Sequence, residues 1–422
     1  MLHACRSIAA PNSCTRGMLE PVYALPALFP RTFTGSNFME PITHLMTGAC
    51  LARAGCNRKA AYATLAMTLA AEAPDLDTLW SAEGPVAGFA HHRGITHTLV
   101  GSPIDGVVVV GAVWLFHRWR VRRVRLTAIH GDASPITLTA APVRWGTLYG
   151  FVLIALLSHL LLDWTNNYGV RPFFPFNPHW YAGSIVFIFE PVLFAVLLIA
   201  LVAPAIFGLI NNEVGARRQV FRGRSWAIFA LVSMLALWGW RAVERSAALR
   251  LAESASYGPT GTMLDDLHSE SEALPQSAPI LRATASPYPG NPYRWHTVVE
   301  TPAFYQLAKV DTLHSTVETD PEQDLFYKPP VTSATQAARR SPLGNAFLDW
   351  SSWPLVTEMG PAAQINGLPG APDWTAVRFL DLRFLYQTPL LDGRRNPPLT
   401  GMVYLDANQH VIRMELGGRP QR

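Results

Sequence analysis

Two aspartates and three histidines lie within one short stretch, residues 73–97, which stands between two hydrophobic segments. They occupy its two ends, as Asp75, Asp77, His91, His92 and His97. Asp oxygens and His nitrogens are common ligands of zinc and related divalent ions. An Asp after Pro is also common in turns and helix caps. This stretch therefore predicts a metal site only if other parts of the chain supply similar groups.

Such groups occur in two other places. His44 lies at the start of a predicted helix, and His159 and Asp163 lie four residues apart in a later hydrophobic segment. A spacing of four places both side chains on one helix face, one turn apart. The predicted ligands of a divalent metal are seven side chains: His44, Asp75, Asp77, His92, His97, His159 and Asp163. Zinc is the first choice, Mn and Fe are the alternatives, and this many ligands allow one ion or two.

Three residues are predicted to take part in catalysis. Glu190 lies in a hydrophobic segment, where an unpaired carboxylate costs on the order of a few kcal/mol. It is therefore predicted to be a general base, a ligand, or an acceptor for a ligating imidazole. The alternative is that the backbone left open by Pro191 satisfies this carboxylate. Asp75 is a second candidate for the base, and Arg93 is predicted to hold an anionic phosphate oxygen.

The composition separates a hydrophobic part from a water-soluble one. The 422 residues are 49% hydrophobic and only 15% charged, and the mean hydropathy is +0.15, which is high for a soluble protein. Apolar runs dominate up to about residue 243, and polar residues dominate afterwards. The formal net charge of +4 is small and scattered along the chain, which argues against a nucleic-acid partner.

Six helices are predicted in the hydrophobic part. Two short ones are expected at about 41–54 and 58–74, and four longer ones at Thr96–Phe116, Thr147–Trp164, Ser184–Ile210 and Trp226–Val243. The longer segments have about 18 to 27 residues, enough to cross a hydrocarbon core of ~30 Å at about 1.5 Å per residue. The short pair is expected to form a partly inserted hairpin.

Arginine positions predict the orientation of these helices. Arg and Lys crowd three connections, at 53–59, 118–125 and 217–224. The opposite loops, at 75–95 and 165–183, contain only Arg93 and Arg171. Because cytoplasmic loops are enriched in Arg and Lys, the three crowded connections are predicted to be cytoplasmic. The predicted ligands would then all lie at outer helix ends. Helix capping and snorkelling histidines are the alternative explanation.

The water-soluble part is predicted to form a small antiparallel sheet outside the membrane. Strands are expected at Trp295–Thr301, Phe304–Val310, Val377–Tyr386, Met402–Leu405 and Val411–Leu416. The best of them alternates apolar and polar residues, and Asp406, Ala407 and Asn408 should form a hairpin turn. The predicted domains are an extension that is disordered or untranslated (1–38), a membrane domain (39–243), a linker (244–292) and the β domain (293–422).

The motifs of the hydrophobic part resemble those of the YdjM-like family of membrane-bound metal-dependent hydrolases. The resemblance covers roughly residues 39–243 and rests on Ile42-Thr43-His44, Pro74-Asp75-Leu76-Asp77, His92-Arg93-Gly94-Ile95-Thr96-His97, His159-Leu160-Leu161-Leu162-Asp163, and Asn167-Tyr168-Gly169-Val170-Arg171 with Pro175-Phe176. It implies an integral inner-membrane protein with a metal-dependent hydrolase site. The His-x-x-x-Asp motif is also similar to that of zinc-dependent phospholipases C. His91 looks like an extra residue beside the family motif and is a weaker candidate ligand.

These predictions combine into an α-helical integral membrane bundle of about six helices, followed by a small extracytoplasmic mainly-β domain. The predicted function is metal-dependent hydrolysis of a phosphoester or similar bond in a lipid-linked or periplasmic substrate. The protein would be a multi-pass protein of the bacterial inner membrane, embedded in the lipid bilayer, with a periplasmic C-terminal domain. The metal would lower the pKa of bound water and polarise the scissile group. The alternative is a non-enzymatic transporter or scaffold that uses the same cluster to bind an ion or to join helix ends.

Overall fold

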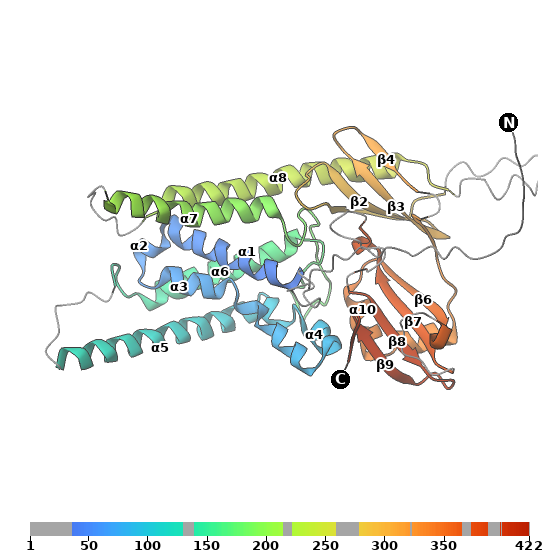
Figure 1. Ribbon diagram of the computed structural model, residues 1–422, viewed down its shortest axis with the longest axis horizontal. Coiled ribbons are helices and arrows are strands. Elements are labelled where there is room, and N and C mark those ends of the chain that lie inside the picture. The colour runs from blue at the N-terminus through green and yellow to red at the C-terminus, as the bar shows by residue number, and fades with distance from the viewer. Residues whose placement is uncertain are drawn as a thin grey trace, which may run out of the picture. The chain divides into compact units, whose positions relative to one another are not determined.

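A helical part is followed by a part built mainly of β-strands (Figure 1). The computed structural model describes residues 36–129, 139–213, 222–258, 278–320, 323–364, 373–386, 397 and 399–421. Most of the predicted N-terminal extension therefore lies outside the described residues. Helix α1 begins at Ser36, earlier than the predicted start near residue 41, and Pro41 lies inside it.

The helical part holds eight α-helices and several shorter turns among the described residues. The helices are α1 (Ser36–Leu51), α2 (Asn57–Lys59), α3 (Ala63–Ala70), α4 (Pro85–His91), α5 (Gly101–Ile129), α6 (Trp145–Thr165), α7 (Pro191–Glu213) and α8 (Arg224–Ser254). The shorter turns are η1 (Ala52–Cys56), η2 (Ala73–Glu83) and η3 (Ile95–His97). The predicted helix at 58–74 is thus reduced to α3, and the predicted loop at 75–95 contains η2 and α4.

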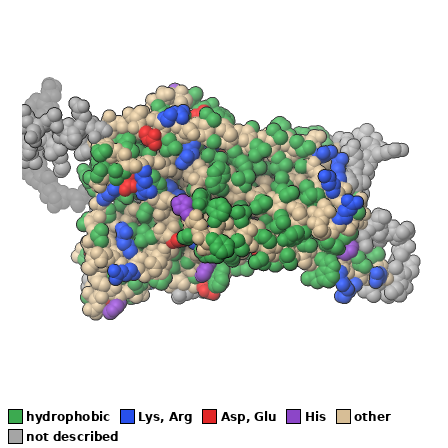
Figure 2. All heavy atoms as spheres, turned by 180° about the vertical axis from the view of Figure 1, so that it is seen from behind, with side chains coloured by type: hydrophobic (Ala, Val, Ile, Leu, Met, Phe, Trp, Pro, Cys, Tyr) green, Lys and Arg blue, Asp and Glu red, His purple; other side chains and the backbone are tan. Residues whose placement is uncertain are grey.

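Three of the described helices are long and apolar enough to cross a membrane. They are Trp145–Thr165, Pro191–Gly208 and Arg224–Ser254. A fourth span results if Pro85–His97 and Gly101–Arg125, which meet at an angle of 84°, are counted as one bent element. Figure 2 shows hydrophobic side chains covering the visible face of the helices, with Lys and Arg gathered at the end away from the β part. The short helices α1 and α3 are not long enough to count as spans.

Helix α5 runs from Gly101 to Ile129 instead of from Thr96 to Phe116. Two other predicted helix boundaries were wrong for a local reason. Helix α7 begins at Pro191 instead of Ser184, because proline suits the first helical position and disfavours helical geometry in the residue before it. Glu190 therefore precedes the helix. Helix α8 continues to Ser254 instead of Val243. Its last turns are rich in Ala, Leu, Arg and Glu, which are strong helix formers even where hydropathy falls.

The β part contains two five-stranded antiparallel sheets instead of one small sheet. The first sheet is formed by β1 (Arg282–Pro287), β2 (Arg294–Glu300), β3 (Phe304–Asp311), β4 (Thr316–Glu318) and β5 (Leu325–Tyr327). The second is formed by β6 (Pro354–Pro361), β7 (Thr375–Asp381), β8 (Gly401–Leu405), β9 (Val411–Leu416) and β10 (Arg419–Pro420). The sequence did not reveal β1, β4, β5, β6, β10 or the helices α9 (Ser333–Arg339) and α10 (Pro342–Trp350). The predicted linker therefore includes the end of α8 and all of β1.

The strands that were predicted for the β part agree with the structure. Strands β2, β3, β8 and β9 lie where they were expected, and β7 ends at Asp381 because Leu382 begins a 3₁₀ turn. Asp406 closes the turn between β8 and β9 by accepting the backbone N–H of Asn408. The tryptophans at 295, 350 and 353 are buried in the core.

Direct contacts fix the loop after α6 against the second sheet. The indole N–H of Trp350 donates to the carbonyl of Tyr168 at 3.1 Å, and the Arg383 guanidinium donates to the carbonyl of Asn167 at 2.9 Å. Tyr168 and Val86 of α4 belong to the same hydrophobic core as α10 and the second sheet. The β part therefore positions the loops at this end of the helices.

Candidate metal centre

All seven predicted ligands come together at the end of the helices that faces the β part. They lie on α1, on η2, on the turn that follows α4, on η3 and on α6. Five of them, together with Arg93, are buried: His44, Asp77, His97, His159 and Asp163 are each at most 6% exposed. Segments far apart in sequence thus place imidazoles and carboxylates in one buried space.

Four of these side chains surround a common point. Nε2 of His97 lies 3.2 Å from Oδ1 of Asp75 and 3.4 Å from Oδ2 of Asp163. Nε2 of His159 lies 3.4 Å from the same Asp163 oxygen and 3.7 Å from the same Asp75 oxygen. Ligands placed about 2.0–2.2 Å from a tetrahedral zinc ion lie about 3.3–3.6 Å apart. These four nitrogen–oxygen spacings are therefore close to those of zinc ligands, and they link two overlapping groups, one with Asp75 and one with Asp163.

His44 adds a fifth ligand atom beside this group. Its Nε2 lies 3.5 Å from Oδ1 of Asp163, and its ring stacks on that of His159 at 3.9 Å between centroids. Two overlapping sets could hold a metal ion, namely His44, Asp75 and His159, and His97, His159 and Asp163. Within each set the ligand atoms lie within 4.8 Å of one another.

The tautomer of His159 supports a cation at this point. Nδ1 of His159 lies 2.7 Å from the carbonyl oxygen of Ala71, so Nδ1 carries the proton and donates it. In a neutral imidazole Nε2 then presents a lone pair, and here it is buried without a hydrogen bond. It faces oxygens of Asp75 and Asp163, so three electron-rich atoms converge. A bound cation removes this repulsion, and a backbone carbonyl on the distal nitrogen is the usual orientation of a metal-bound histidine.

Asp77 orients the histidines, and its oxygens face away from the common point. Its Oδ1 lies 3.1 Å from Nδ1 of His92, and its Oδ2 lies 3.1 Å from Nδ1 of His97. Oδ2 also accepts the backbone N–H of Arg93 at 2.7 Å. Burial raises the pKa of the Asp77 carboxyl, but hydrogen bonds from the two histidines outweigh burial and hold that pKa well below its usual range. Asp77 belongs to neither ligand set, so its predicted role as a ligand stays a prediction and its contacts are those of a supporting residue.

His92 is held at the edge of the cluster. Its side chain is 23% exposed, its ring packs edge-on against Tyr168 at 5.5 Å, and it belongs to neither ligand set. The carboxylate of Asp77 fixes its Nδ1, which leaves Nε2 for another partner. Of the seven predicted ligands, His92 and Asp77 are thus the two that the geometry separates from the common point.

Arg93 is buried, and its side chain forms hydrogen bonds and an ion pair with other residues of the chain. Its Nη2 lies 2.8 Å from Oδ1 of Asp163, and its Nη1 donates to the carbonyl of Gly169 at 2.6 Å and to Oδ1 of Asn166 at 3.4 Å. Its backbone has φ of 52°, a left-handed conformation that is uncommon for a non-glycine residue. Arg93 therefore fixes Asp163 and the loop after α6. Its predicted contact with a substrate phosphate stays a prediction.

Glu190 lies outside both ligand sets. Its carboxylate forms a buried ion pair with Arg241 of α8 at 2.5 Å and accepts the backbone N–H of Gly290 at 3.1 Å. It also lines a cavity of about 20 Å³ together with His44. From the sequence, Glu190 was predicted to lie about two turns inside a helix and to have a partner in the metal site. The structure locates it before α7 with an arginine partner, so its role as general base stays a prediction.

Sequence reasoning gave no role to Asn166 and Tyr168, which support the site. Oδ1 of Asn166 accepts the backbone N–H groups of Tyr168 and Gly169, and the Arg93 guanidinium lies over the Tyr168 ring at 4.7 Å from its centroid. Their signal in the sequence was a polar, glycine-containing segment directly after the His-x-x-x-Asp helix. That pattern predicts a loop at the site without predicting which atoms the loop contacts.

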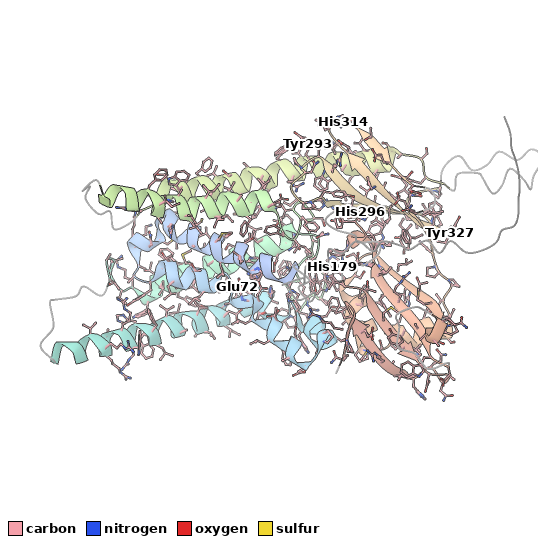
Figure 3. The ribbon with its side chains drawn as sticks, viewed as in Figure 1. Glu72, His179, Tyr293, His296, His314 and Tyr327 are labelled. Carbon is pink, nitrogen blue, oxygen red and sulfur yellow. The ribbon has the colours of Figure 1, made fainter. Side chains whose placement is uncertain are left out.

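Other titratable residues lie outside the metal centre. His91 is exposed and stacks on Trp80, in line with its weaker prediction. Figure 3 shows Glu72 within the helical part and His296 and His314 on the first sheet. His296 is buried and hydrogen-bonded to the carbonyl of Leu382. His268 lies outside the described residues.

Comparisons with known proteins agree with the membrane character of the helical part. Residues 39–248 match the family described as YdjM inner membrane protein. The uncharacterized protein YfhP of Bacillus subtilis is 24% identical over 164 residues, which are 37% of this chain and 43% of that protein. The match thus spans less than half the length of that relative. No solved structure matches the chain. Over residues 39–248, the chain belongs to the YdjM inner membrane protein family.

Proposed function

We propose that this protein is a membrane-bound, metal-dependent hydrolase that acts on a phosphoester or similar bond. One observation carries the proposal: Nε2 of His97 and Nε2 of His159 both lie 3.2–3.7 Å from carboxylate oxygens of Asp75 and Asp163, in one cluster with zinc-like spacing. Imidazole and carboxylate ligands together are typical of catalytic zinc sites, whereas structural sites more often use thiolates. The two cysteines of the described residues, Cys50 and Cys56, belong to neither ligand set.

The residues that would hold the metal differ from those that would support it. The ligands would be His44, Asp75, His97, His159 and Asp163. The ion would supply Lewis acidity to polarise the scissile group and activate water. Asp77 would keep His97 in the tautomer that presents Nε2 to the common point, and Arg93 would hold Asp163 in place through their ion pair. Such supporting contacts orient ligands and tune their basicity.

The site is proposed to lie at the outer face of the bacterial inner membrane, with the β part in the periplasm. The Arg-rich stretch 118–125 near the C-terminal end of α5 supports this orientation, because Arg and Lys near the ends of spanning helices are enriched on the cytoplasmic side. A lipid-linked or periplasmic substrate would then reach the site from the outer leaflet. Alkaline phosphatase fused after residue 300 should be active, and fused after residue 130 inactive. The reverse pattern would show that the site faces the cytoplasm.

Turnover by purified protein tests the proposal. The full chain in detergent should contain a divalent metal and hydrolyse a member of a panel of phosphoesters, lipid-linked phosphates and amides. His159→Ala should lose metal and turnover together. His314→Ala removes a histidine that also pairs with an aspartate but is 68% exposed in the β part, so it should change neither. If metal-loaded protein hydrolyses no member of the panel, the hydrolase proposal fails, and ion transport or a structural metal takes its place.

A further inference from the structure

A second cavity lies where the helical part meets both sheets. It has a volume of about 280 Å³, just below the range of about 300–1,000 Å³ common for small-molecule sites. Its wall is formed by the segment from the end of α6 to Ser184, by α8, by β1 and by the segments that flank β6 and β7. Neither ligand set of the metal centre lines it.

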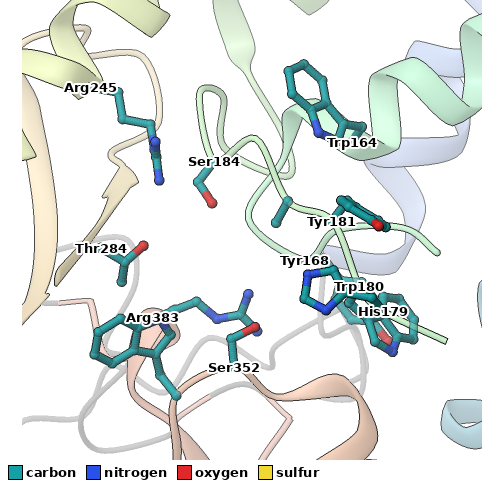
Figure 4. A pocket seen from close by; sticks show the side chains of 12 residues that line it. Trp164, Tyr168, His179, Trp180, Tyr181, Ser184, Arg245, Thr284, Ser352 and Arg383 are labelled. Carbon is teal, nitrogen blue, oxygen red and sulfur yellow. The ribbon is translucent and has the colours of Figure 1, made fainter. Parts of the chain in front are cut away.

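The charge of this cavity is positive. Figure 4 shows Arg245 and Arg383 reaching into it from α8 and from the 3₁₀ turn that follows β7. Arg383 is already paired with the buried carboxylate of Asp381, 2.7 Å away. The Nε of Arg245 donates to the carbonyl of Ala285 at 3.3 Å, and no carboxylate of the described residues forms an ion pair with it. Among the residues that the structure describes, no acidic side chain lines the cavity, so the charge of Arg245 is available to an anion.

Hydroxyl groups and aromatic rings complete the wall. Ser184 and Thr284 present their hydroxyls beside the two arginines (Figure 4). Ser184 is only 3% exposed and has φ of 50°, a left-handed conformation that a non-glycine residue rarely adopts. Trp180 and Trp353 stand among the aromatic residues of the wall. Hydrogen-bond donors beside a guanidinium suit a phosphate, and aromatic faces suit the carbon skeleton that bears it.

The cavity lies one side chain away from the metal centre. Tyr168 lines the cavity and contacts His92 and Arg93 of the metal centre. Trp164 also lines it and follows the ligand Asp163 directly in sequence. Tyr168 and the end of α6 therefore connect the cavity with the metal centre.

We propose that this cavity binds the phosphorylated polar group of a small phosphorylated alcohol or of an anionic phospholipid headgroup. Arg245 pairs with the phosphate, and the aromatic wall packs against the group that bears it. The identification of this group as part of the substrate rests on the proposed hydrolase function. The binding itself needs no turnover, so a binding measurement separates the two.

The test measures binding of two probes to the detergent-purified full chain. Glycerol 3-phosphate represents the soluble source and is titrated by calorimetry, with glycerol as the uncharged control. For the lipid source, thermal unfolding is compared in nanodiscs of phosphatidylcholine with and without phosphatidylglycerol. At least one phosphate probe should bind, and the stronger probe identifies the source.

Two variants assign the binding to this cavity. Arg245→Gln should lower the affinity for the probe about 10- to 100-fold, the loss expected for one charge-assisted hydrogen bond. Ser352→Trp, at an exposed position of the wall, should block the cavity and abolish binding. Arg250→Gln removes an exposed arginine one and a half turns further along α8 and should leave binding unchanged.

A third variant separates this cavity from the metal centre. Binding that persists in His159→Ala and disappears in Ser352→Trp supports the proposal. Binding that is lost in His159→Ala and unchanged in Arg245→Gln would assign the phosphate to the metal and overturn the proposal, without touching the hydrolase function. The proposal also fails if neither phosphate probe binds the wild-type chain.

Discussion

Asp77→Asn tests whether the carboxylate of Asp77 orients the ligands or is itself a ligand. The substitution keeps the shape of the side chain but removes its charge and turns one oxygen into an NH₂ group. That group cannot accept the N–H of a histidine or of the Arg93 backbone. At least one of the contacts at 3.1 Å to His92 and His97, or the one at 2.7 Å to Arg93 N, must be lost.

The expected loss follows from these contacts. A hydrogen bond that involves a charged group contributes about 1.5–3 kcal/mol, and about 1.4 kcal/mol corresponds to a tenfold change in affinity. Asp77→Asn should therefore weaken metal binding about 10- to 150-fold, in the range of about 10- to 100-fold found for residues that orient metal ligands. His159→Ala should lose the metal altogether, because it removes a ligand.

Metal affinity can be measured by competition with a chromophoric chelator on the detergent-purified chain. Asp311→Asn is the matched control, because Asp311 also lies 3.2 Å from a histidine Nδ1 but at the exposed surface of the β part. It should leave affinity unchanged. If Asp77→Asn abolishes metal binding as completely as His159→Ala, Asp77 is a ligand. If affinity changes less than twofold in a folded variant, the orienting role is refuted.

Three further predictions concern the ion, the Glu190 pair and the junction with the β part. Removing the metal with a chelator should lower the thermal midpoint, and zinc should restore it, because a ligand present at about 1,000 times its Kd stabilises by about 4 kcal/mol; an unchanged midpoint would contradict a tightly bound ion. Glu190→Gln should destabilise the fold by about 3–5 kcal/mol in denaturant unfolding, because it leaves the Arg241 charge buried without its partner. It should also keep the metal content, and loss of metal would make Glu190 a ligand. Burial raises the pKa of Asp381, but the charge and hydrogen bonds of Arg383 outweigh burial and hold it below its ordinary value. The stability that this pair contributes is therefore present above about pH 4 and lost as the pH falls further, so the difference in unfolding free energy between wild type and Asp381→Asn should shrink in acid. A stability difference that stays constant as the pH falls would contradict the lowered pKa of Asp381.

Local pattern was enough to find the ligands and the long helices. The spacing of His159 and Asp163 places them on one helix face whatever surrounds that helix, because the period of an α-helix depends only on the backbone. Apolar length predicts spanning segments for a similar reason, since the thickness of the hydrocarbon core sets the number of residues needed. The start of α7 and the end of α8 were predicted wrongly, although the sequence contains a signal for both. Pro191 marks the start of α7, and strong helix formers continue α8.

The role of each site residue depends on contacts between distant segments, which no local sequence pattern contains. Asp75 and Asp77 are two residues apart and chemically identical, yet one faces His159 and the other holds His92. Burying a charge is favourable only beside a partner, and the partner of Glu190 is Arg241, 51 residues away. The sequence by itself determined which groups were available and the spacing of those that share a helix. Only the tertiary structure decided which of them meet, because packing between distant segments sets the direction of each side chain.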